Sequence, residues 1–558
     1  MLYPKSNVYR DVYNLNGLWR FKTVEENYQP RLPIVDGELM AVPASYNEIV
    51  TDKKMKDHVG KVVYEKTFSI PVREHKLYRL RIGAASHKCE VYLNGEKIGE
   101  GINGYFPIDL PLENLQEENR ISVIIDNRLS FQTFPVGMMV DGKQIIQHDF
   151  YNFTGIHRDV LLYSLPEKYI EDIEIKTVVE GRYESVSVLV KTACENVRYS
   201  VLDADRNLIL ETDKNEFDIL SPRTWCPQSP YLYTLVVETE CDKYEEKFGI
   251  RKVEVKDGKF FLNGEPVYLK GFGMHEDFFL LGKGNNPALN LRNFELLKWT
   301  NANSIRTSHY PYSEEIMDLA DEYGIMVIDE VPAVGMNWWG GGTFLPDRVN
   351  EETCALHKEL IGRLIERDKN HPSVIMLSVA NEAATHEENS RSYFENVISF
   401  ARSVCTLPIM IVEFTKFDDG CKVGDLVDVI GLNRYYGWYT DHANMDVVYS
   451  QMKEEIEKYY NGFGKPIVIT EFGVDTIEGL HAYPSESFSE EFQKEYLEEC
   501  CRAFDDTAYC IGEQVWNFAD FKTKQGLTRI RGNRKGVFTK DRQPKAAAHY
   551  LKKRWEDK

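Results

Sequence analysis

Two glutamates directly follow apolar runs in the second half of this 558-residue chain. Glu382 closes the run Val374-Ile-Met-Leu-Ser-Val-Ala-Asn-Glu, and Glu471 follows Ile467-Val-Ile-Thr. A single carboxylate in such a place can equally well cap the next helix or pair with a cation of the scaffold. Two of them at the ends of two strands of one barrel favour a working pair, because retaining glycosidases use one carboxylate as the nucleophile and a second carboxyl group as acid and then base.

A second group of polar residues lies near the end of the chain. The segment Arg529-Ile-Arg-Gly-Asn-Arg-Lys carries four basic residues in seven, in a chain whose net charge is -21. A solvated basic loop is one interpretation. Asn533 and Lys535 are two positions apart, however, so on an extended stretch their side chains point the same way. An amide donor beside an ammonium group would hold a carboxylate.

The chain after Asn263-Gly264 indicates the scaffold, because strand-like runs there alternate with helical runs of 3.6-residue periodicity. The predicted strands are 267–273, 304–308, 326–330, 374–379, 409–413, 429–433, 467–470 and 511–516. The predicted helices include 291–299, 314–323, 352–367, 394–404, 447–460, 490–504 and 546–555. Eight such β/α units in about 300 residues indicate a TIM (β/α)8 barrel, whose chemistry takes place at the C-terminal ends of the strands. Both glutamates stand at such ends.

The first half of the chain has a different pattern. Residues 1–166 contain short alternating strands separated by turn residues and no convincing amphipathic helix, which predicts a β-sandwich. Strands continue over 167–252, at the length of one immunoglobulin-like β-sandwich. We therefore predict a multidomain β plus α/β protein with an N-terminal sandwich over 1–166, an immunoglobulin-like sandwich over 167–252 and a C-terminal barrel over 253–558.

Composition excludes several classes of function. An acidic surface repels phosphate backbones, so we expect no nucleic-acid partner. The chain has no run of about 18 uncharged apolar residues and no secretory signal, so we expect a cytoplasmic protein without a membrane partner. The ten cysteines form no C-x-x-C pair and indicate neither a disulfide framework nor a zinc site. The P-loop, H-E-x-x-H and G-x-S-x-G motifs are also missing, which removes the usual NTPase, zinc-protease and serine-hydrolase hypotheses.

Two longer motifs resemble the signatures of glycoside hydrolase family 2. One is Asn303-Ser-Ile-Arg-Thr-Ser-His-Tyr-Pro with Asp321-Glu-Tyr-Gly-Ile-Met-Val-Ile-Asp-Glu behind it, and the other is the segment from Asp368 to Glu382. The resemblance covers essentially the whole chain and implies a jelly-roll-like, sugar-binding-like first sandwich and a catalytic barrel. Three further segments look like those of the family's β-glucuronidases; they begin at Asp428, Glu513 and Gly532.

The resemblance implies a role for each candidate residue. Glu382 would be the acid/base, Glu471 the nucleophile and Asn381 a donor to the sugar 2-hydroxyl, with Tyr435 hydrogen-bonded to Glu471. Asn533 and Lys535 would bind the uronic acid carboxylate with help from Arg529. Asp149, in the His148-Asp149 loop of the first sandwich, would contact the 4-hydroxyl region, and Trp516 would be an apolar platform. Tyr439, His275 and His309 are carried over as pocket residues, although each histidine could also be a satisfied core residue.

The implied activity is that of a retaining exo-β-glucuronidase that needs no cofactor and no metal. Its substrate would be a small-molecule or oligosaccharide β-glucuronide, and relatives suggest a homo-oligomer. The alternatives are a β-galacturonidase or another family 2 glycosidase, and a non-catalytic carbohydrate-binding protein.

The sequence departs from the family pattern at three places. Leu377 stands where a tryptophan is common in the family, and Phe472 stands where a tyrosine is common. The segment Val331–Asn350, which contains Trp338 and Trp339, is shorter than the active-site loop of some bacterial relatives and predicts a more open entrance.

Overall fold

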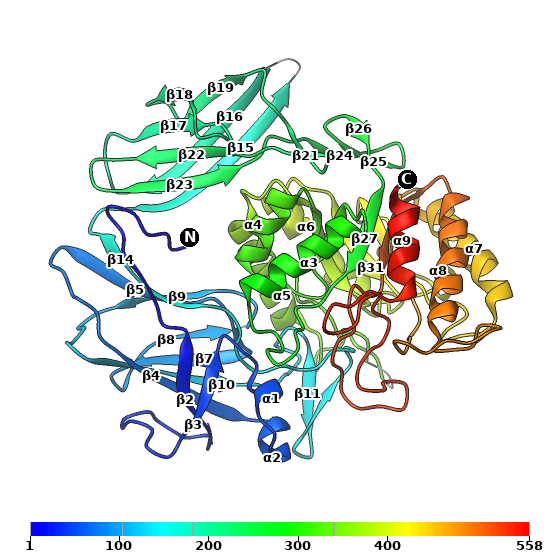
Figure 1. Ribbon diagram of the computed structural model, residues 1–558, viewed down its shortest axis with the longest axis horizontal. Coiled ribbons are helices and arrows are strands. Elements are labelled where there is room, and N and C mark those ends of the chain that lie inside the picture. Colours follow the sequence, from blue (N-terminus) through cyan, green and yellow to red (C-terminus); the bar gives the residue numbers. More distant parts are fainter. Residues whose placement is uncertain (1, 103, 181–182, 339–340, 557) are drawn as a thin grey trace.

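The computed structural model of the chain describes residues 2–102, 104–180, 183–338, 341–556 and 558. Figure 1 shows three parts: a sandwich built by the N-terminal strands, a second sandwich above it, and a barrel surrounded by helices. The predicted fold class is therefore confirmed. The division at residues 166 and 252 remains our proposal for the domain limits.

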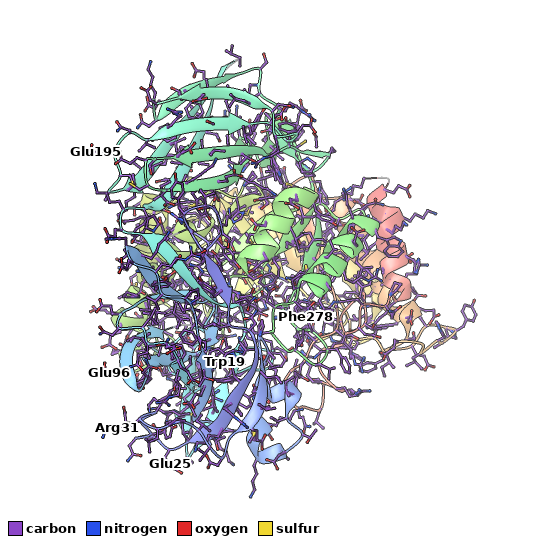
Figure 2. All side chains as sticks on the ribbon, turned by 60° about the vertical axis from the view of Figure 1, so that its left-hand side comes forward. Trp19, Glu25, Arg31, Glu96, Glu195 and Phe278 are labelled. Carbon is purple, nitrogen blue, oxygen red and sulfur yellow. The ribbon has the colours of Figure 1, made fainter. Side chains whose placement is uncertain are left out.

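The first sandwich packs two antiparallel sheets face to face, in the orders β1-β14-β5-β9 and β3-β2-β4-β10-β7-β8. Apolar side chains on the inner faces form its core, and Figure 2 marks Trp19, which is buried there. Two helices of one turn each, α1 (Tyr46–Ile49) and α2 (Lys53–Lys56), are too short to show a periodicity in the sequence. The strands are β1 (Val12–Asn14), β2 (Gly17–Val24), β3 (Glu38–Val42), β4 (Lys61–Phe68), β5 (Lys76–Ile82), β6 (Ala85–Ser86), β7 (Lys88–Leu93), β8 (Glu96–Ile102), β9 (Ile108–Leu112), β10 (Asn119–Asp126), β11 (Gly137–Val140), β12 (Lys143–Ile146), β13 (Gly155–Ile156) and β14 (Val160–Pro166).

The second sandwich pairs the sheet β15-β16-β19 with the sheet β18-β17-β22-β23 around its own apolar core. Its strands are β15 (Ile170–Glu180), β16 (Tyr183–Thr192), β17 (Arg198–Leu202), β18 (Leu208–Thr212), β19 (Glu216–Leu220), β20 (Trp225–Cys226), β21 (Ser229–Pro230), β22 (Tyr233–Glu238) and β23 (Lys243–Phe248). A small sheet of β24 (Val253–Lys256), β25 (Lys259–Leu262) and β26 (Glu265–Pro266) follows. Phe260 and Trp225 share a core with residues near the starts of the barrel strands, so this link closes the N-terminal end of the barrel.

The barrel strands β27 to β34 are parallel and close through the β27–β34 pair. All residues of β28 to β34 are buried, which explains why β29 to β33 are mostly apolar in the sequence. The strands are β27 (Leu269–Gly273), β28 (Ser304–Arg306), β29 (Met326–Glu330), β30 (Val374–Asn381), β31 (Ile409–Glu413), β32 (Val429–Asn433), β33 (Ile467–Glu471) and β34 (Cys510–Val515).

Helices cover the outside of the barrel, and several begin at a capping side chain. Asn286, Ser313 and Ser489 each accept hydrogen bonds from backbone N–H groups of the first turn, as N-cap residues do. The helices are α3 (Pro287–Trp299), α4 (Glu314–Tyr323), α5 (Glu351–Asp368), α6 (Ser390–Val404), α7 (Val448–Phe463), α8 (Glu490–Asp505) and α9 (Ala546–Glu556), with the 3-10 turns η1 (Phe417–Asp419) and η2 (Met445–Val447). None of the described helices is long and apolar enough to cross a membrane.

The first sandwich also touches the C-terminal side of the barrel. The N–H of Tyr151, between β12 and β13, donates to the carbonyl of Lys522 (2.9 Å), and the N–H of Val136 donates to the carbonyl of Val334 (3.3 Å). Lys522 follows β34 and Val334 follows β29. A loop of the first sandwich therefore lies beside the strand ends where a TIM barrel holds its chemistry.

Candidate active site

A cavity of about 210 Å³ lies at the C-terminal ends of the barrel strands. This is smaller than the ~300–1,000 Å³ of sites for drug-sized ligands, and it suits one sugar ring rather than several. All of the predicted site residues except Lys535 and His275 line it. The lining residues are Gln147, His148, Asp149, His309, Val334, Gly335, Asn337, Asn381, Glu382, Tyr435, Tyr439, Glu471, Trp516, Arg529 and Asn533.

Glu382 is held at the cavity through its backbone and its side chain. It follows β30 with a φ of 52°, in the left-handed region that residues other than glycine rarely adopt. Its N–H donates to the carbonyl of Val412 on the next strand (2.9 Å), and its Oε1 accepts from Nδ2 of Asn433 (2.8 Å). These bonds stabilise the strained turn and fix the position of the carboxyl group.

Glu471 is the last residue of β33, and both of its carboxylate oxygens are bonded. Oε1 accepts from Nη2 of Arg306 (2.6 Å), and Oε2 accepts from the Tyr435 hydroxyl (2.7 Å). Arg306 is itself fully buried and paired with Glu330 (2.8 Å). A buried carboxylate that faces a guanidinium and a phenol has the partners that an ionised group requires.

Burial raises the pKa of both glutamates. For Glu471 burial is the largest cause; Arg306 lowers the pKa, the charge of Glu382 raises it again, and the result is a pKa of about 8. For Glu382 burial is again the largest cause, and the hydrogen bond from Asn433 opposes it. Because the two charges repel each other, a proton on one member of the pair is favoured. Glu471 has the stronger donors, so we assign this proton to Glu382.

Asn381 precedes Glu382 and has a fixed orientation. Its Oδ1 accepts from Nη1 of Arg306 and from Nδ2 of Asn433, each at 3.3 Å. The amide oxygen is therefore already engaged, and the NH2 group is the part of this side chain that can donate to a ligand in the cavity.

Aromatic rings form another part of the cavity wall. Trp516 stacks on His309 with ring centroids 5.1 Å apart, and Nδ1 of His309 bonds Oε1 of Glu330 (3.0 Å). Burial lowers the pKa of His309 to about 4, although the bond to Glu330 opposes this, so the imidazole is neutral at pH 7. His275, the other predicted pocket histidine, lies behind Trp516 and bonds the Tyr310 hydroxyl (3.0 Å) without lining the cavity.

Six side chains at and behind one end of the cavity form what we call the polar corner: Asp149, Tyr439, Asp475, Arg529, Asn533 and Lys535. Arg529 donates from Nε to both oxygens of Asp149 (2.8 and 3.1 Å) and from Nη2 to the Tyr439 hydroxyl (2.6 Å). Asn533 donates from Nδ2 to Oδ2 of Asp149 (3.1 Å). The corner thus joins the first sandwich to the loop that follows β34.

Lys535 lies behind the wall rather than on it. Its side chain is fully buried, and its ammonium group donates to Asp475 and to the Tyr439 hydroxyl (2.9 Å). The basic segment predicted a corner with excess positive charge. The structure instead matches Arg529 and Lys535 with two carboxylates, Asp149 and Asp475, so the four charges sum to zero.

Sequence reasoning assigned no role to Arg306, Asn433 or Asp475. Arg306 and Asn433 are the last residues of β28 and β32, so the strand-end rule that singled out Glu382 could also have found them. Asp475 follows Glu471 by four residues in a loop, and no local pattern marks it as the partner of Lys535.

The segment Val331–Asn350, which the sequence places at the entrance, contributes Val334, Gly335 and Asn337 to the cavity wall. Trp338 is buried and packs edge-on against Phe131 of the first sandwich at 5.1 Å between ring centroids, so it is a core residue. Trp339 lies outside the described residues.

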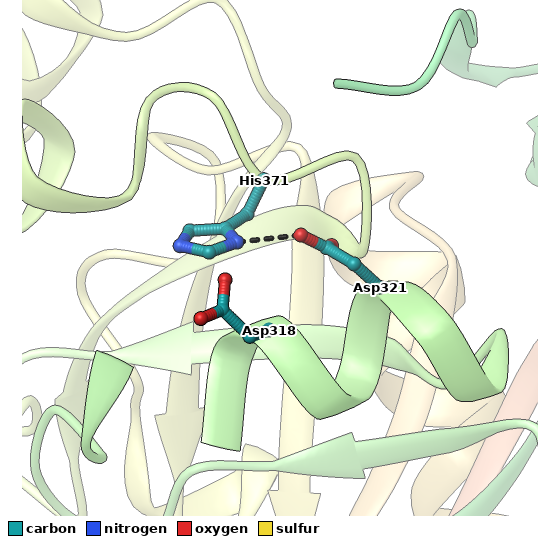
Figure 3. A group of neighbouring side chains, drawn as sticks. All are labelled: Asp318, Asp321 and His371. Atoms are coloured by element: carbon teal, nitrogen blue, oxygen red, sulfur yellow. Dashed lines mark hydrogen bonds and ion pairs between the residues drawn. The ribbon is translucent and has the colours of Figure 1, made fainter. Parts of the chain in front are cut away.

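One cluster of described side chains, Asp318, Asp321 and His371, could offer three metal ligands (Figure 3). Nδ1 of His371 bonds Oδ2 of Asp321 (2.6 Å), and Oδ1 of Asp321 accepts from the N–H of Ser373 (2.9 Å). Burial opposes protonation, yet Asp321 raises the pKa of His371 to about 10, and a protonated imidazole cannot ligate a metal. His371 also precedes β30, at the end of the barrel opposite the cavity. We interpret the cluster as an ion pair that joins α4 to the barrel.

Known proteins resemble the chain along its whole length. Its residues 12–166 match the family description "Glycosyl hydrolases family 2, sugar binding domain", 168–251 match "Glycosyl hydrolases family 2", and 253–558 match "Glycosyl hydrolases family 2, TIM barrel domain". A beta-glucuronidase of Paenibacillus borealis is 42% identical over 100% of this chain and 98% of its own length. The solved beta-glucuronidase of an uncultured Clostridium sp. superposes with a TM-score of 0.97 at 42% identity, covering 100% of both chains. That of Ruminococcus gnavus in complex with D-glucaro-d-lactam has a TM-score of 0.92 at 38% identity, covering 99% of both.

Proposed function

Since the chain belongs to glycosyl hydrolase family 2, we propose that this glycoside hydrolase is a retaining exo-β-glucuronidase. One observation carries the proposal: the two glutamates share a single cavity of one-sugar size with Tyr439, Arg529 and Asn533 of the polar corner. The similarity to the beta-glucuronidases of Paenibacillus and Clostridium supports the choice of a uronic acid.

In the proposed first step, a carboxylate oxygen of Glu471 attacks the anomeric carbon while the bond from this carbon to the leaving oxygen breaks. Glu382 gives its proton to that oxygen, and a glycosyl ester of Glu471 forms. In the second step Glu382, now a carboxylate, takes a proton from water. The water oxygen attacks the anomeric carbon and Glu471 leaves, so the configuration is retained and no cofactor is required.

The neighbours of the two glutamates support these roles. Arg306 and Tyr435 lower the pKa of Glu471 against the effect of burial, and their hydrogen bonds align its carboxylate for the attack. The NH2 group of Asn381 would donate to the sugar 2-hydroxyl, an interaction that strengthens in the oxocarbenium-like transition state. Trp516 would form an apolar platform under the ring.

The polar corner would select the carboxylate of the sugar. The Tyr439 hydroxyl accepts N–H bonds from both Arg529 and Lys535, which leaves its own hydrogen to donate to a ligand. Lys535 would thus act mainly through Tyr439, which it polarises, while Asn533 and Arg529 meet the carboxylate directly. Asp149 would accept from the 4-hydroxyl group.

The proposed function predicts that p-nitrophenyl β-D-glucuronide is hydrolysed at least about tenfold faster, in kcat/KM, than the matching β-glucoside, β-galactoside and β-galacturonide. Hydrogen bonds to a charged group contribute about 1.5–3 kcal/mol, which accounts for the preference over the two neutral glycosides. The galacturonide carries the same carboxylate, so discrimination against it depends on the contact between Asp149 and the 4-hydroxyl group. NMR of the first product should show β-glucuronic acid before it mutarotates. Faster turnover of a neutral sugar would contradict the proposed carboxylate recognition, and preference for the galacturonide would point to the alternative uronidase.

The shared proton predicts an alkaline limb in the pH profile. Glu382 must be protonated to act as the acid, and burial raises its pKa, so kcat/KM should fall as the pH rises through that raised pKa. Initial rates between pH 5 and 10 would measure it. Glu382→Gln should remove this limb from the slow residual hydrolysis of an aryl glucuronide. A limb that persists in this variant would place the titrating proton elsewhere.

Two finer expectations also remain proposals. We expect a homo-oligomer, which light scattering on the purified protein would test, and we expect the enzyme to act in the cytoplasm. Both rest on resemblance and composition rather than on any contact described above.

A further inference from the structure

We propose that the Asp149 carboxylate occupies the position in which the substrate carboxylate binds, and that it must leave this position when a uronic acid binds. This inference rests on the proposed function and deepens it, because it makes Asp149 a competitor built into the site. Only a ligand that carries its own carboxylate could replace Asp149 on equal terms.

The contacts of Asp149 are those expected of a bound uronate. Its carboxylate accepts from Nε and Nη2 of Arg529 (2.8 and 2.7 Å to Oδ2) and from Nδ2 of Asn533 (3.1 Å). A guanidinium fork and an amide are strong donors for a carboxylate. They are also two of the donors that the proposed function assigns to the sugar acid.

The charge balance indicates that one of the two carboxylates already present must be displaced when a substrate carboxylate binds. Arg529 and Lys535 already face Asp149 and Asp475, so a third carboxylate among them would add an uncompensated negative charge. Uncompensated charge in a desolvated site is strongly unfavourable. The incoming carboxylate must therefore replace one of the two that are present.

Burial decides which one leaves. The side chain of Asp475 is only 3% exposed, and its Oδ1 accepts from the backbone N–H of Arg534 (2.8 Å). The side chain of Asp149 is 46% exposed, so it can move into water without losing its hydration. Once released, it can accept from the 4-hydroxyl group of the bound sugar.

The exchange would make the site selective in a way that donors alone do not. A neutral glycoside brings no anion for Arg529, so Asp149 would remain bonded to Arg529 and Asn533 and stay in the place of the C6 substituent. A uronide exchanges one carboxylate for another, and the total charge of the polar corner is kept.

The test uses acetate as a probe of the carboxylate-binding position. Acetate has no sugar hydroxyl groups, so its binding reports on this position alone. Asp149→Asn keeps the size of the side chain and an oxygen acceptor but removes the charge. We expect acetate to inhibit this variant competitively, with an inhibition constant about tenfold lower than in the unmodified enzyme. Asp149→Ser should behave in the same way. Asp141→Asn, in the exposed turn of the β11–β12 hairpin, is the matched control and should leave the inhibition constant of acetate unchanged.

The outcomes separate this inference from the proposed function. If the unmodified enzyme prefers glucuronides but acetate inhibits both Asp149 variants and the unmodified enzyme equally, the exchange is wrong and the function stands. If the unmodified enzyme prefers neutral glycosides, the function is wrong. Tighter acetate binding in the two variants would then still support an anion-binding position that Asp149 occupies.

Discussion

Glu471→Gln is expected to lower kcat on an aryl β-glucuronide by on the order of 10⁴-fold or more, because the amide cannot form the glycosyl ester. The glutamine carbonyl oxygen can still accept from Arg306, and its NH2 group can donate to the Tyr435 hydroxyl oxygen. Arg306 also keeps its ion pair with Glu330, so the fold should be retained. Initial rates and thermal unfolding of the same preparation would separate lost chemistry from lost structure.

Glu413 offers a matched control for this variant. It also ends a barrel strand, is fully buried and bonds Thr385 (2.6 Å), but it does not line the cavity. Burial raises its pKa to about 7, so a neutral amide is a mild replacement. Glu413→Gln should keep kcat within about threefold. Full activity in Glu471→Gln would exclude Glu471 as the nucleophile, and an inactive unmodified enzyme would revive the hypothesis of a non-catalytic carbohydrate-binding protein.

Lys535→Met is expected to lower kcat/KM on glucuronides by roughly 10- to 150-fold, the equivalent of about 1.5–3 kcal/mol for a hydrogen bond to a charged group. The Tyr439 hydroxyl would lose one of its two cationic donors and become a weaker donor to the substrate carboxylate. A neutral glycoside carries no carboxylate, so its kcat/KM should change little. Steady-state kinetics on both substrates measure the difference.

The structure adds a stability effect to this prediction. Lys535 is the buried partner of Asp475, so removing it alone leaves a poorly compensated carboxylate and should destabilise the protein by roughly 3 kcal/mol. The double variant Lys535→Met, Asp475→Asn removes both charges. It should recover most of the lost stability in urea unfolding and should not recover glucuronide activity. An equal loss of activity on both substrates would mean that Lys535 has only a structural role.

Much of the fold could be predicted because the signals are local. The apolar runs that contain β29, β30 and β33 are buried on both faces, and this burial is what made them visible as strands. The strand-end rule then placed Glu382 and Glu471 at one face of the barrel, and the structure puts both in one cavity. The four-residue helices α1 and α2 were missed because one turn has no period to detect.

The candidate site was predictable as a set of residues but not as an arrangement. Resemblance named Asp149, Arg529 and Lys535, and the spacing of Asn533 and Lys535 suggested two side chains that face the same way. In the structure Asn533 lines the cavity and Lys535 lies behind Tyr439. Which side of the wall each side chain occupies depends on the packing of the loop after β34, which no local pattern encodes.

Sequence alone thus established the order of the three folding units and the glutamates at the strand ends, since hydrophobic periodicity and turn residues are properties of neighbouring positions. Only the tertiary structure decided the electrostatics of the site. Arg306 meets Glu471 across 165 positions of the chain, and Asp149 meets Arg529 across 380. Such contacts exist only after distant elements have packed, and they convert a basic stretch of sequence into a corner whose charges cancel.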